Sequence, residues 1–377
     1  MIEKVTNSNQ LSRLVLKGYK SIAECDIELG ALNVLIGANG AGKSNFISLF
    51  RLLNEMYEQR LQLYVQKQGG PDVLLHFGRV ASERLYAEFH FQLTKPASVR
   101  TAYRFSLIPT LDNRFVFESE ESLFFGGELE VVNPGHMLGR GHAESKLKDA
   151  KDDHSRYVRP SVSSWRVYHF HDTSPSARVK QIHGINDNEY LRDDARNLAA
   201  FLYRLSKHHE SHYRRIVKSV QLVAPFFGGF HLRPSVDNPE SIQLEWTEAG
   251  QDVPFTASAL SDGTLRFICL ATVLLQPEAF MPATILIDEP ELGLHPFAVK
   301  VLGGMMKSTA ESHQIIVSTQ SVELVNEFDI DNLIVVDKQG GASTFKRPNA
   351  EALSEWLNDY SLGELWNKNL LGGRPTR

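Results

Sequence analysis

The sequence predicts an α/β fold with a mixed, mainly parallel core sheet, an antiparallel β subdomain and an inserted α/β lobe. Strand and helix patterns alternate in the last third of the chain, as they do in parallel sheets flanked by helices. Near the N-terminus, the apolar run 32–36 precedes the pattern GxxxxGK[ST] at residues 37–44, and Phe46, Phe50 and Leu53 follow at helical spacing. Strand, loop and helix therefore stand in the order that a phosphate-binding loop requires.

The N-terminal part is expected to be rich in strands. Residues 14–16 and 22–29 form an opening pair of strands before the loop. After the first helix, Gly69-Gly70-Pro71 breaks the pattern. Apolar and polar residues then alternate over three segments, at 85–93, 103–107 and 115–117. This alternation predicts an antiparallel meander beside the phosphate loop.

The middle of the chain is more polar. From Glu118 to Ser163 it contains Gly126-Gly127, Pro134-Gly135 and a charged run, which predicts a loop-rich excursion with little core. Helical spacing returns at 197–205 and 213–223, and strands are expected near 229–232 and 242–246. We therefore expect an N-terminal part of the main lobe at 1–120, an inserted lobe at 121–255, and the rest of the main lobe at 256–377.

The last third carries the alternation that defines the fold. Helices are expected at 265–275 and 296–306, and strands at 284–287, 314–317 and 333–336. No internal repeat and no long heptad pattern is found in the sequence.

The phosphate loop predicts the chemistry of a nucleoside triphosphate site. Its backbone N–H groups can surround phosphate oxygens, and the following helix offers its positive end. The loop residues are Gly37, Ala38, Asn39, Gly40, Ala41 and Gly42. Lys43 can reach the β and γ phosphates, and the Ser44 hydroxyl can be a ligand to Mg²⁺. The alternative is a glycine-rich turn with a surface lysine.

Two acidic residues follow the strand at 284–287. Asp288 would stand at the C-terminal end of a buried strand, where such sheets collect their ligands, and is expected to hold Mg²⁺. Glu289 is placed to orient or deprotonate the water that attacks the γ-phosphate. The alternative is that both acids cap the next helix.

A third segment, Leu260-Ser261-Asp262-Gly263-Thr264, precedes a helical pattern. It resembles the signature sequence of ABC-type ATPases. The run from Glu289 to Pro296 resembles the stretch after the catalytic carboxylate in the RecF, SMC and OLD-like branch of that family, and the opening run from Leu14 to Ile22 is similar to its first strand and turn. The resemblance covers residues 11–60 and 255–340.

The resemblance implies a P-loop ATPase head that forms a homodimer around ATP. Ser261 and Gly263 of one copy would then point at the γ-phosphate bound by Lys43 and Ser44 of the other, and loss of that phosphate would loosen the pair. Residues 292–295 would form the loop that crosses between the two sites. These roles come from the family, since a Ser-Asp-Gly run alone is a common turn.

One position departs from the family pattern. ABC-type ATPases usually carry a histidine after the strand that follows the catalytic glutamate, whereas this chain has Gln320 there. Glutamine can donate a hydrogen bond to a phosphate oxygen but cannot carry charge. We therefore expect slow hydrolysis. For the glutamine of the family's Q-loop, Gln66 and Gln68 are candidates by position alone.

Composition bounds the location and the partners. The net charge of −5 argues against a chain that coats nucleic acid indiscriminately. Cys25 and Cys269 are the only cysteines, which suits a reducing cytoplasm better than a disulfide framework. The strongly apolar stretch 267–275 is too short to cross a bilayer, and the N-terminus lacks the features of a signal peptide. We therefore expect a cytoplasmic protein with no membrane contact.

Basic and histidine-rich segments could have either binding roles or plain surface roles. Lys207, Arg214 and Lys218 are expected on one helical face beside Arg215, where they could meet DNA as in related heads, although a solvated face is favoured. Two groups of histidines could in principle bind a metal, but structural or surface roles are favoured for both. These groups are His208, His209 and His212 on one helix, and His169 and His171 on one strand face.

The main functional hypothesis is an ATP-gated dimer that hydrolyses ATP in DNA repair or defence against phage. Too few residues follow Asp288 for the Toprim domain of OLD-like nucleases, so a nuclease or toxin effector would be a separate chain. The alternative is a regulatory protein that binds nucleotide with negligible turnover, which Gln320 favours. A transporter motor is disfavoured by the long interval between Lys43 and Ser261.

Overall fold

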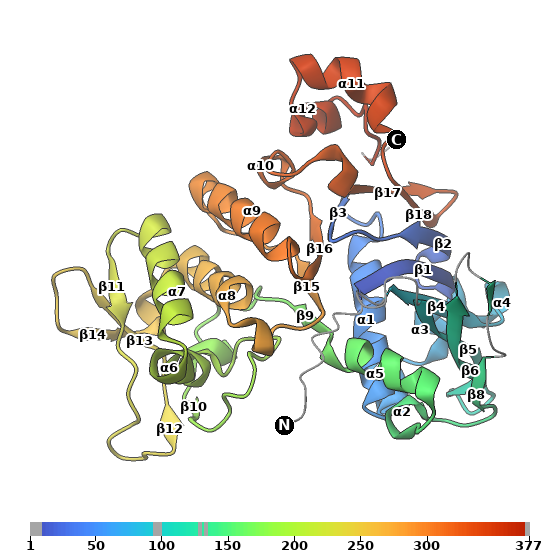
Figure 1. Cartoon of the computed structure of the whole chain (residues 1–377), viewed down its shortest axis with the longest axis horizontal. Helices are drawn as coiled ribbons and strands as arrows, with labels where there is room; N and C mark the ends of the chain where they lie inside the picture. Colours follow the sequence, from blue (N-terminus) through green and yellow to red (C-terminus); the bar gives the residue numbers. More distant parts are fainter. Residues whose placement is uncertain (1–9, 93–99, 127–129, 132–134, 374–377) are drawn as a thin grey trace.

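A computed structural model describes residues 10–92, 100–126, 130–131 and 135–373. Figure 1 shows an antiparallel sheet on one side, a mainly parallel sheet in the centre, and a helical lobe on the other side. The helices α11 (Ala350–Asp359) and α12 (Leu362–Asn367) stand above the central sheet in this view. The predicted class of fold is confirmed.

The central sheet has the strand order β18-β17-β3-β16-β15-β9 within the described residues. All of its neighbouring pairs are parallel except β17 with β18. The strands are β3 (Leu32–Ile36), β9 (Arg166–Tyr168), β15 (Thr284–Asp288), β16 (Gln314–Thr319), β17 (Leu333–Gln339) and β18 (Ala342–Lys346). Every residue of β3, β15 and β16 is buried, because helices cover both faces of a parallel sheet.

Alternate residues of these strands point into two different cores. Leu35 and Leu286 pack on α1 (Lys43–Tyr57), whereas Val34 and Ile287 pack on α8 (Asp262–Leu275) and α9 (Pro296–Ala310). The period of two along each strand produces this division. Because β3, β16 and β15 are parallel neighbours, their carboxyl ends lie together at one end of the sheet.

The antiparallel sheet has the order β2-β1-β4-β5-β6-β7, with β8 also paired to β6. Its strands are β1 (Gln10–Tyr19), β2 (Ile22–Glu28), β4 (Leu85–Gln92), β5 (Arg100–Pro109), β6 (Phe115–Gly126), β7 (Glu130–Val131) and β8 (His136–Gly139). The meander is therefore confirmed, with the last residue expected for its first strand, Leu93, outside the described residues. Phe50 of α1 packs edge-on against Phe89 and Trp165 beneath the sheet.

The stretch from Glu118 to Ser163 was expected to have little core, and that expectation is wrong. β6 continues to Gly126, and α5 (Asp153–Ser164) packs on α1, with Val158 and Val162 fully buried. The stretch reads as polar partly because buried positions of β6 are themselves polar, as at Glu120 and Ser122. Pro134 and Gly127 lie outside the described residues. The division at 120/121 and 255/256 stays a prediction, although β6 runs across position 120.

The helical lobe contains α6 (Leu198–His208) and α7 (Glu210–Val223), with α7 packed on α8. Small antiparallel sheets complete it, made of β10 (His183–Gly184) with β12 (Ser241–Ile242), and β11 (Phe227–Phe230), β13 (Glu245–Glu248) and β14 (Pro254–Thr256). Two details differ from expectation, because the helix breaks at His209. The three histidines do not share one helix, and Lys207 lies on α6 rather than with the basic residues of α7.

Short helices complete the chain. They are α2 (Leu61–Gln68), α3 (Pro71–Leu74), α4 (Gly78–Ala81) and α10 (Val322–Val325). Gln66 and Gln68 are exposed residues of α2, which follows the end of α1 opposite the phosphate loop. Cys25 and Cys269 are buried, and no disulfide involves either in the described structure. Among the described helices, none is long and apolar enough to cross a membrane.

Candidate functional site

The predicted phosphate loop connects β3 to α1. Gly42 is the N-cap of α1, and Lys43 is its first residue. The first N–H groups of a helix have no intrahelical acceptor and carry the positive end of the helix dipole. Asn39 and Gly40 are exposed, as is Ser44 in the first turn. The loop therefore presents backbone donors and one hydroxyl at the carboxyl edge of the central sheet.

Packing explains why glycine occupies the first position of this loop. A Cβ atom at Gly37 would lie 2.2 Å from the backbone oxygen of Val336 on the neighbouring strand β17. A backbone atom cannot move aside as a flexible side chain can. Gly37 is thus held directly against β17.

Lys43 is folded onto its own loop. Its side chain is buried, and Nζ donates hydrogen bonds to the backbone oxygens of Gly37 at 2.7 Å and Ala38 at 3.1 Å. Burial lowers the pKa of Lys43, and the nearby carboxylates of Glu289 and Asp288 oppose that shift. An ammonium held this way at a helix N-terminus is suited to bind an anion.

Asp288 ends β15 and lies next to Ser318 at the end of β16. The Ser318 hydroxyl donates a hydrogen bond to Oδ1 of Asp288. The carboxylate is therefore fixed at the sheet edge and does not cap the next helix, since α9 is capped by His295. Carboxylate and hydroxyl oxygens are the donors that Mg²⁺ prefers, so Asp288 and Ser44 fit the ion in chemical type.

Glu289 has an unusual backbone conformation. Its φ is +46°, a left-handed value that is uncommon for residues other than glycine, and its N–H donates to the backbone oxygen of Ser318 at 2.9 Å. Nε2 of Gln320 donates to Oε1 of Glu289 at 2.8 Å. The structure thus brings together Glu289 and Gln320, which are far apart in sequence, and strain of this kind is often found at functional sites.

Glu291 is a residue that the sequence reasoning missed. It is buried, and its Oε1 accepts hydrogen bonds from the Thr319 hydroxyl at 2.7 Å and the Gln320 N–H at 3.1 Å. Among the described residues, Oε2 has no hydrogen-bond partner. Burial raises the pKa of Glu291 despite these hydrogen bonds. Glu291 therefore fixes the backbone that carries Gln320, and only the Glu-Pro-Glu spacing could have suggested it.

His169 and His171 were assigned structural or surface roles, yet they lie beside Asp288. They follow β9, the strand parallel to β15 at the sheet edge. His169 Nδ1 lies 4.0 Å from Asp288 Oδ2, and His171 Nε2 lies 3.2 Å from the Asp288 backbone oxygen. Burial, with His171 and Arg51 adding to it, lowers the pKa of His169 to about 4. His169 is therefore neutral at pH 7, and no pattern in the sequence indicated its position.

The signature-like segment begins α8. Ser261 is the exposed N-cap, and its Oγ accepts a hydrogen bond from the Thr264 N–H at 3.2 Å. A Cβ atom at Gly263 would lie 2.3 Å from the backbone oxygen of Gly293, so the start of α8 packs directly on the 292–295 loop. In Figure 1, α8 and α1 lie on opposite sides of β9. Ser261 itself is exposed to solvent at the start of α8.

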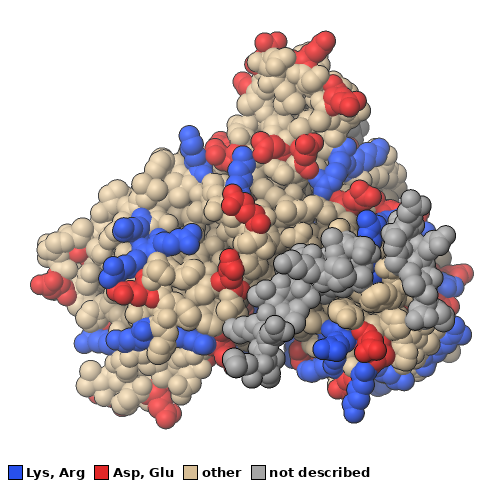
Figure 2. Space-filling model, viewed as in Figure 1, with Lys and Arg blue, Asp and Glu red and all other residues tan. Residues whose placement is uncertain are grey.

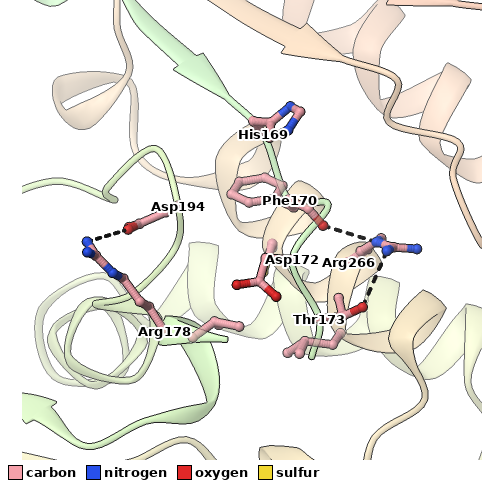
Figure 3. Close-up of a pocket in the computed structure, with 10 residues that line it drawn as sticks. His169, Phe170, Asp172, Thr173, Arg178, Asp194 and Arg266 are labelled. Carbon is pink, nitrogen blue, oxygen red and sulfur yellow. Dashed lines mark hydrogen bonds and ion pairs between the residues drawn. The ribbon is translucent and has the colours of Figure 1, made fainter. Parts of the chain in front are cut away.

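Arg266 connects this segment to the acidic site. It donates hydrogen bonds to the backbone oxygens of Phe170 at 3.0 Å, His171 at 2.9 Å and Leu292 at 3.0 Å. Figure 3 shows it on the wall of a cavity of about 190 Å³, beside Thr173 and below His169. One guanidinium therefore connects α8 to the loop after β9 and to the loop after Asp288.

The histidine groups do not form a metal site in the described residues. His209 lies between α6 and α7. The Nδ1 atom of His212 is hydrogen-bonded to the backbone oxygen of Leu275. Within the described ranges, no group of three or more His, Cys, Asp or Glu side chains could hold a metal ion.

The arrangement of a phosphate loop after β3 and acids at the end of β15 defines a class of protein, the P-loop ATPases with an ABC-like head. Residues 32–326 match the family described as "AAA domain, putative AbiEii toxin, Type IV TA system", and the chain belongs to this family. The OLD nuclease of Thermus scotoductus is 22% identical over 379 aligned residues, which span 94% of this chain and 67% of that protein.

Solved structures of similar fold include SMC heads. The SmcHead bound to the C-winged helix domain of ScpA has a TM-score of 0.63 at 18% identity, covering 92% of this chain and 99% of its own. The Smc head with an extended coiled coil, bound to a ScpA domain from Pyrococcus furiosus, has a TM-score of 0.58 at 16% identity, covering 93% and 98%. The resemblance inferred from the motifs is confirmed.

Proposed function

We propose that this chain binds ATP with Mg²⁺ and hydrolyses it slowly to ADP and phosphate, as a homodimer with ATP between the copies. The observation that carries the proposal is the convergence of Lys43, Asp288, Glu289 and Gln320 at one edge of the central sheet, where the carboxylates act on the pKa of Lys43.

Each side chain has a role in this scheme. Residues 37–42 and Lys43 bind the phosphates, while Ser44 and Asp288 would hold Mg²⁺, which neutralises phosphate charge when bound. Glu289 orients the attacking water and accepts its proton, and Gln320 keeps the Glu289 carboxylate in place through the 2.8 Å hydrogen bond. In the dimer, Ser261 and Gly263 of the second copy complete the site.

Two substitutions test the chemistry. Lys43→Ala removes a charge-assisted contact and should weaken ATP binding about 10- to 100-fold. Glu289→Gln should retain ATP binding but lower single-turnover hydrolysis on the order of 10²- to 10⁴-fold, since it removes the general base. The measurements are calorimetric binding and single-turnover product formation with purified full chain. Unchanged affinity in Lys43→Ala would refute the site.

A regulatory protein with negligible turnover is the second candidate. The observation favouring it is Gln320, which cannot carry charge in the position where a histidine is usual. In that case Glu289→Gln would not change the already absent hydrolysis, while Lys43→Ala would still weaken ATP binding. The same pair of variants therefore separates the two candidates.

The pathway we propose is DNA repair or defence against phage, with a separate nuclease or toxin chain as effector. The family description, which names a toxin–antitoxin system, and the likeness to an OLD nuclease support this context. Figure 2 shows Lys and Arg side chains gathered where Figure 1 places α7, which carries Arg214, Arg215 and Lys218. Binding of duplex DNA to this face, weakened by salt, would support DNA as a partner.

A further inference from the structure

A buried lysine lies beside the start of α8, and the scheme above does not use it. Lys180 ends a short 3₁₀ turn (Arg178–Lys180), and its side chain is 6% exposed. Its Nζ donates a hydrogen bond to the backbone oxygen of Thr173 at 2.6 Å. The closest carboxylate is Oδ1 of Asp262, at 3.8 Å, which is beyond hydrogen-bond distance.

A buried ammonium in this position requires compensation. Lysine has three donors, and removing its charge from water is costly unless the charge is paired and hydrogen-bonded. Lys180 also acts on Asp172, whose pKa is lowered first by the hydrogen bonds from Ser174 and then by Lys180. Both acids are mostly exposed, so neither holds Lys180 as a close buried partner would. Lys180 therefore has capacity for a further anion.

The position of Asp262 marks the place where a further anion would bind. Asp262 is the first residue of α8, directly after the exposed N-cap Ser261. The first N–H groups of a helix and its dipole favour an anion at this place, and the Asp262 carboxylate supplies one from within the chain. Its side chain is 61% exposed and can turn into water. A phosphate group arriving here would find the helix N-terminus and the buried Lys180 already in place.

We propose that Lys180 binds the γ-phosphate of the ATP held by a second copy of this chain, and that Asp262 is the counter-ion of Lys180 when no nucleotide is bound. This inference rests on the proposed ATP-bridged dimer. Binding exchanges one anion for another at the start of α8, and loss of the γ-phosphate after hydrolysis returns Lys180 to Asp262. The exchange links the nucleotide state to the strength of the dimer.

The test measures dimerisation of the full chain with ATP in the Glu289→Gln background, by analytical ultracentrifugation. Lys180→Met should weaken the ATP-dependent dimer about 10- to 100-fold, because it removes a charged hydrogen-bond donor from the phosphate. Asp262→Asn should strengthen it about two- to fivefold, because it removes a like charge beside the phosphate and frees Lys180. ATP affinity of the monomer should be unchanged in both, since Lys43 remains.

Lys307→Met is the control for removing a lysine from an exposed ion pair. Lys307 Nζ lies 3.7 Å from Oδ2 of Asp329, nearly the separation of Lys180 and Asp262, but on α9. This variant should dimerise as the parent does. An equal weakening in Lys307→Met, or a dimer unaffected by Lys180→Met, overturns the inference.

Other outcomes distinguish a failure of this inference from a failure of the proposed dimer. If Lys180→Met does not fold, Asp262→Asn still decides, because a dimer that is weakened or unchanged by this variant contradicts the role of Asp262 as a competing anion. If the parent chain binds ATP through Lys43 but forms no dimer, the proposed dimer and the inference both fail. A dimer that is insensitive to Lys180 and Asp262 overturns the inference alone.

Discussion

Replacing Gly42 by alanine should damage the phosphate loop far more than the same change at Gly40. Both glycines have positive φ angles, +119° at Gly42 and +78° at Gly40. A Cβ atom at Gly40 meets nothing within 4 Å, so this substitution costs only the left-handed conformation, about 1–2 kcal/mol. Gly40→Ala is therefore the matched control.

At Gly42 the added methyl group also meets packed atoms. Its Cβ would lie 2.1 Å from Ser343 Oγ and 2.9 Å from Ser21 Oγ. Ser343 is buried. Its hydroxyl donates a hydrogen bond to the Ala41 backbone oxygen at 2.5 Å and forms another with Ser21 Oγ at 2.7 Å. Moving Ser343 aside breaks both hydrogen bonds, about 0.5–1.5 kcal/mol each. With strain of about 1–3 kcal/mol, Gly42→Ala should cost about 2–6 kcal/mol in total.

Urea unfolding of the two variants, with wild type alongside, measures this difference as a free energy of unfolding. Calorimetric titration then compares their ATP affinities, which should fall more for Gly42→Ala because Gly42 caps the helix that begins with Lys43. A free energy of unfolding for Gly42→Ala equal to or above that of Gly40→Ala would show that Ser343 does not hold the loop, and the reasoning would be refuted.

Two other predictions concern stability and coupling. Glu120 is fully buried and accepts hydrogen bonds from Tyr103 Oη at 2.6 Å and His142 Nε2 at 2.8 Å. Burial alone would raise the pKa of Glu120. These two hydrogen bonds and a third from Ser145 outweigh burial and lower the pKa below the usual 4.5. Glu120→Gln should therefore lower the free energy of unfolding by about 3–5 kcal/mol at pH 7. Because the pKa of Glu120 is depressed in the folded state, its stabilisation is present above pH 4.5 and is lost as pH falls through the folded pKa. In urea unfolding, the difference in free energy between wild type and Glu120→Gln should therefore narrow below pH 4.5. A gap independent of pH would contradict a charged Glu120. Arg266→Met should leave ATP affinity nearly unchanged but lower the melting temperature and weaken the ATP-dependent dimer. The reason is that three backbone oxygens each lose a hydrogen-bond donor, at about 1–3 kcal/mol each and not additively. A dimer of normal strength despite the lower melting temperature would show that Arg266 is only structural.

The local elements of the site were predictable because their signals lie in short segments. Adjacent residues specify each of these signals. They are the apolar run before Gly37, the helical spacing of 3.6 after Ser44, and the acids after the strand that ends at Asp288. The class of fold follows from the alternation of strands and helices. The roles of Ser261 and Gln320 came from family resemblance, and the structure adds that Ser261 is exposed and that Gln320 contacts Glu289.

Contacts between distant segments could not be read in this way, because they depend on the order of strands in the sheet. His169 reaches Asp288 only because β9 pairs with β15 at the sheet edge. Glu120 appeared to belong to a polar loop, but the pairing of β5 with β6 turns its side chain into the core. Lys180 meets Asp262 because the 3₁₀ turn at Arg178–Lys180 lies beside the start of α8. Adjacent residues determine which element forms, whereas burial and the pairing of remote strands decide which side chains meet.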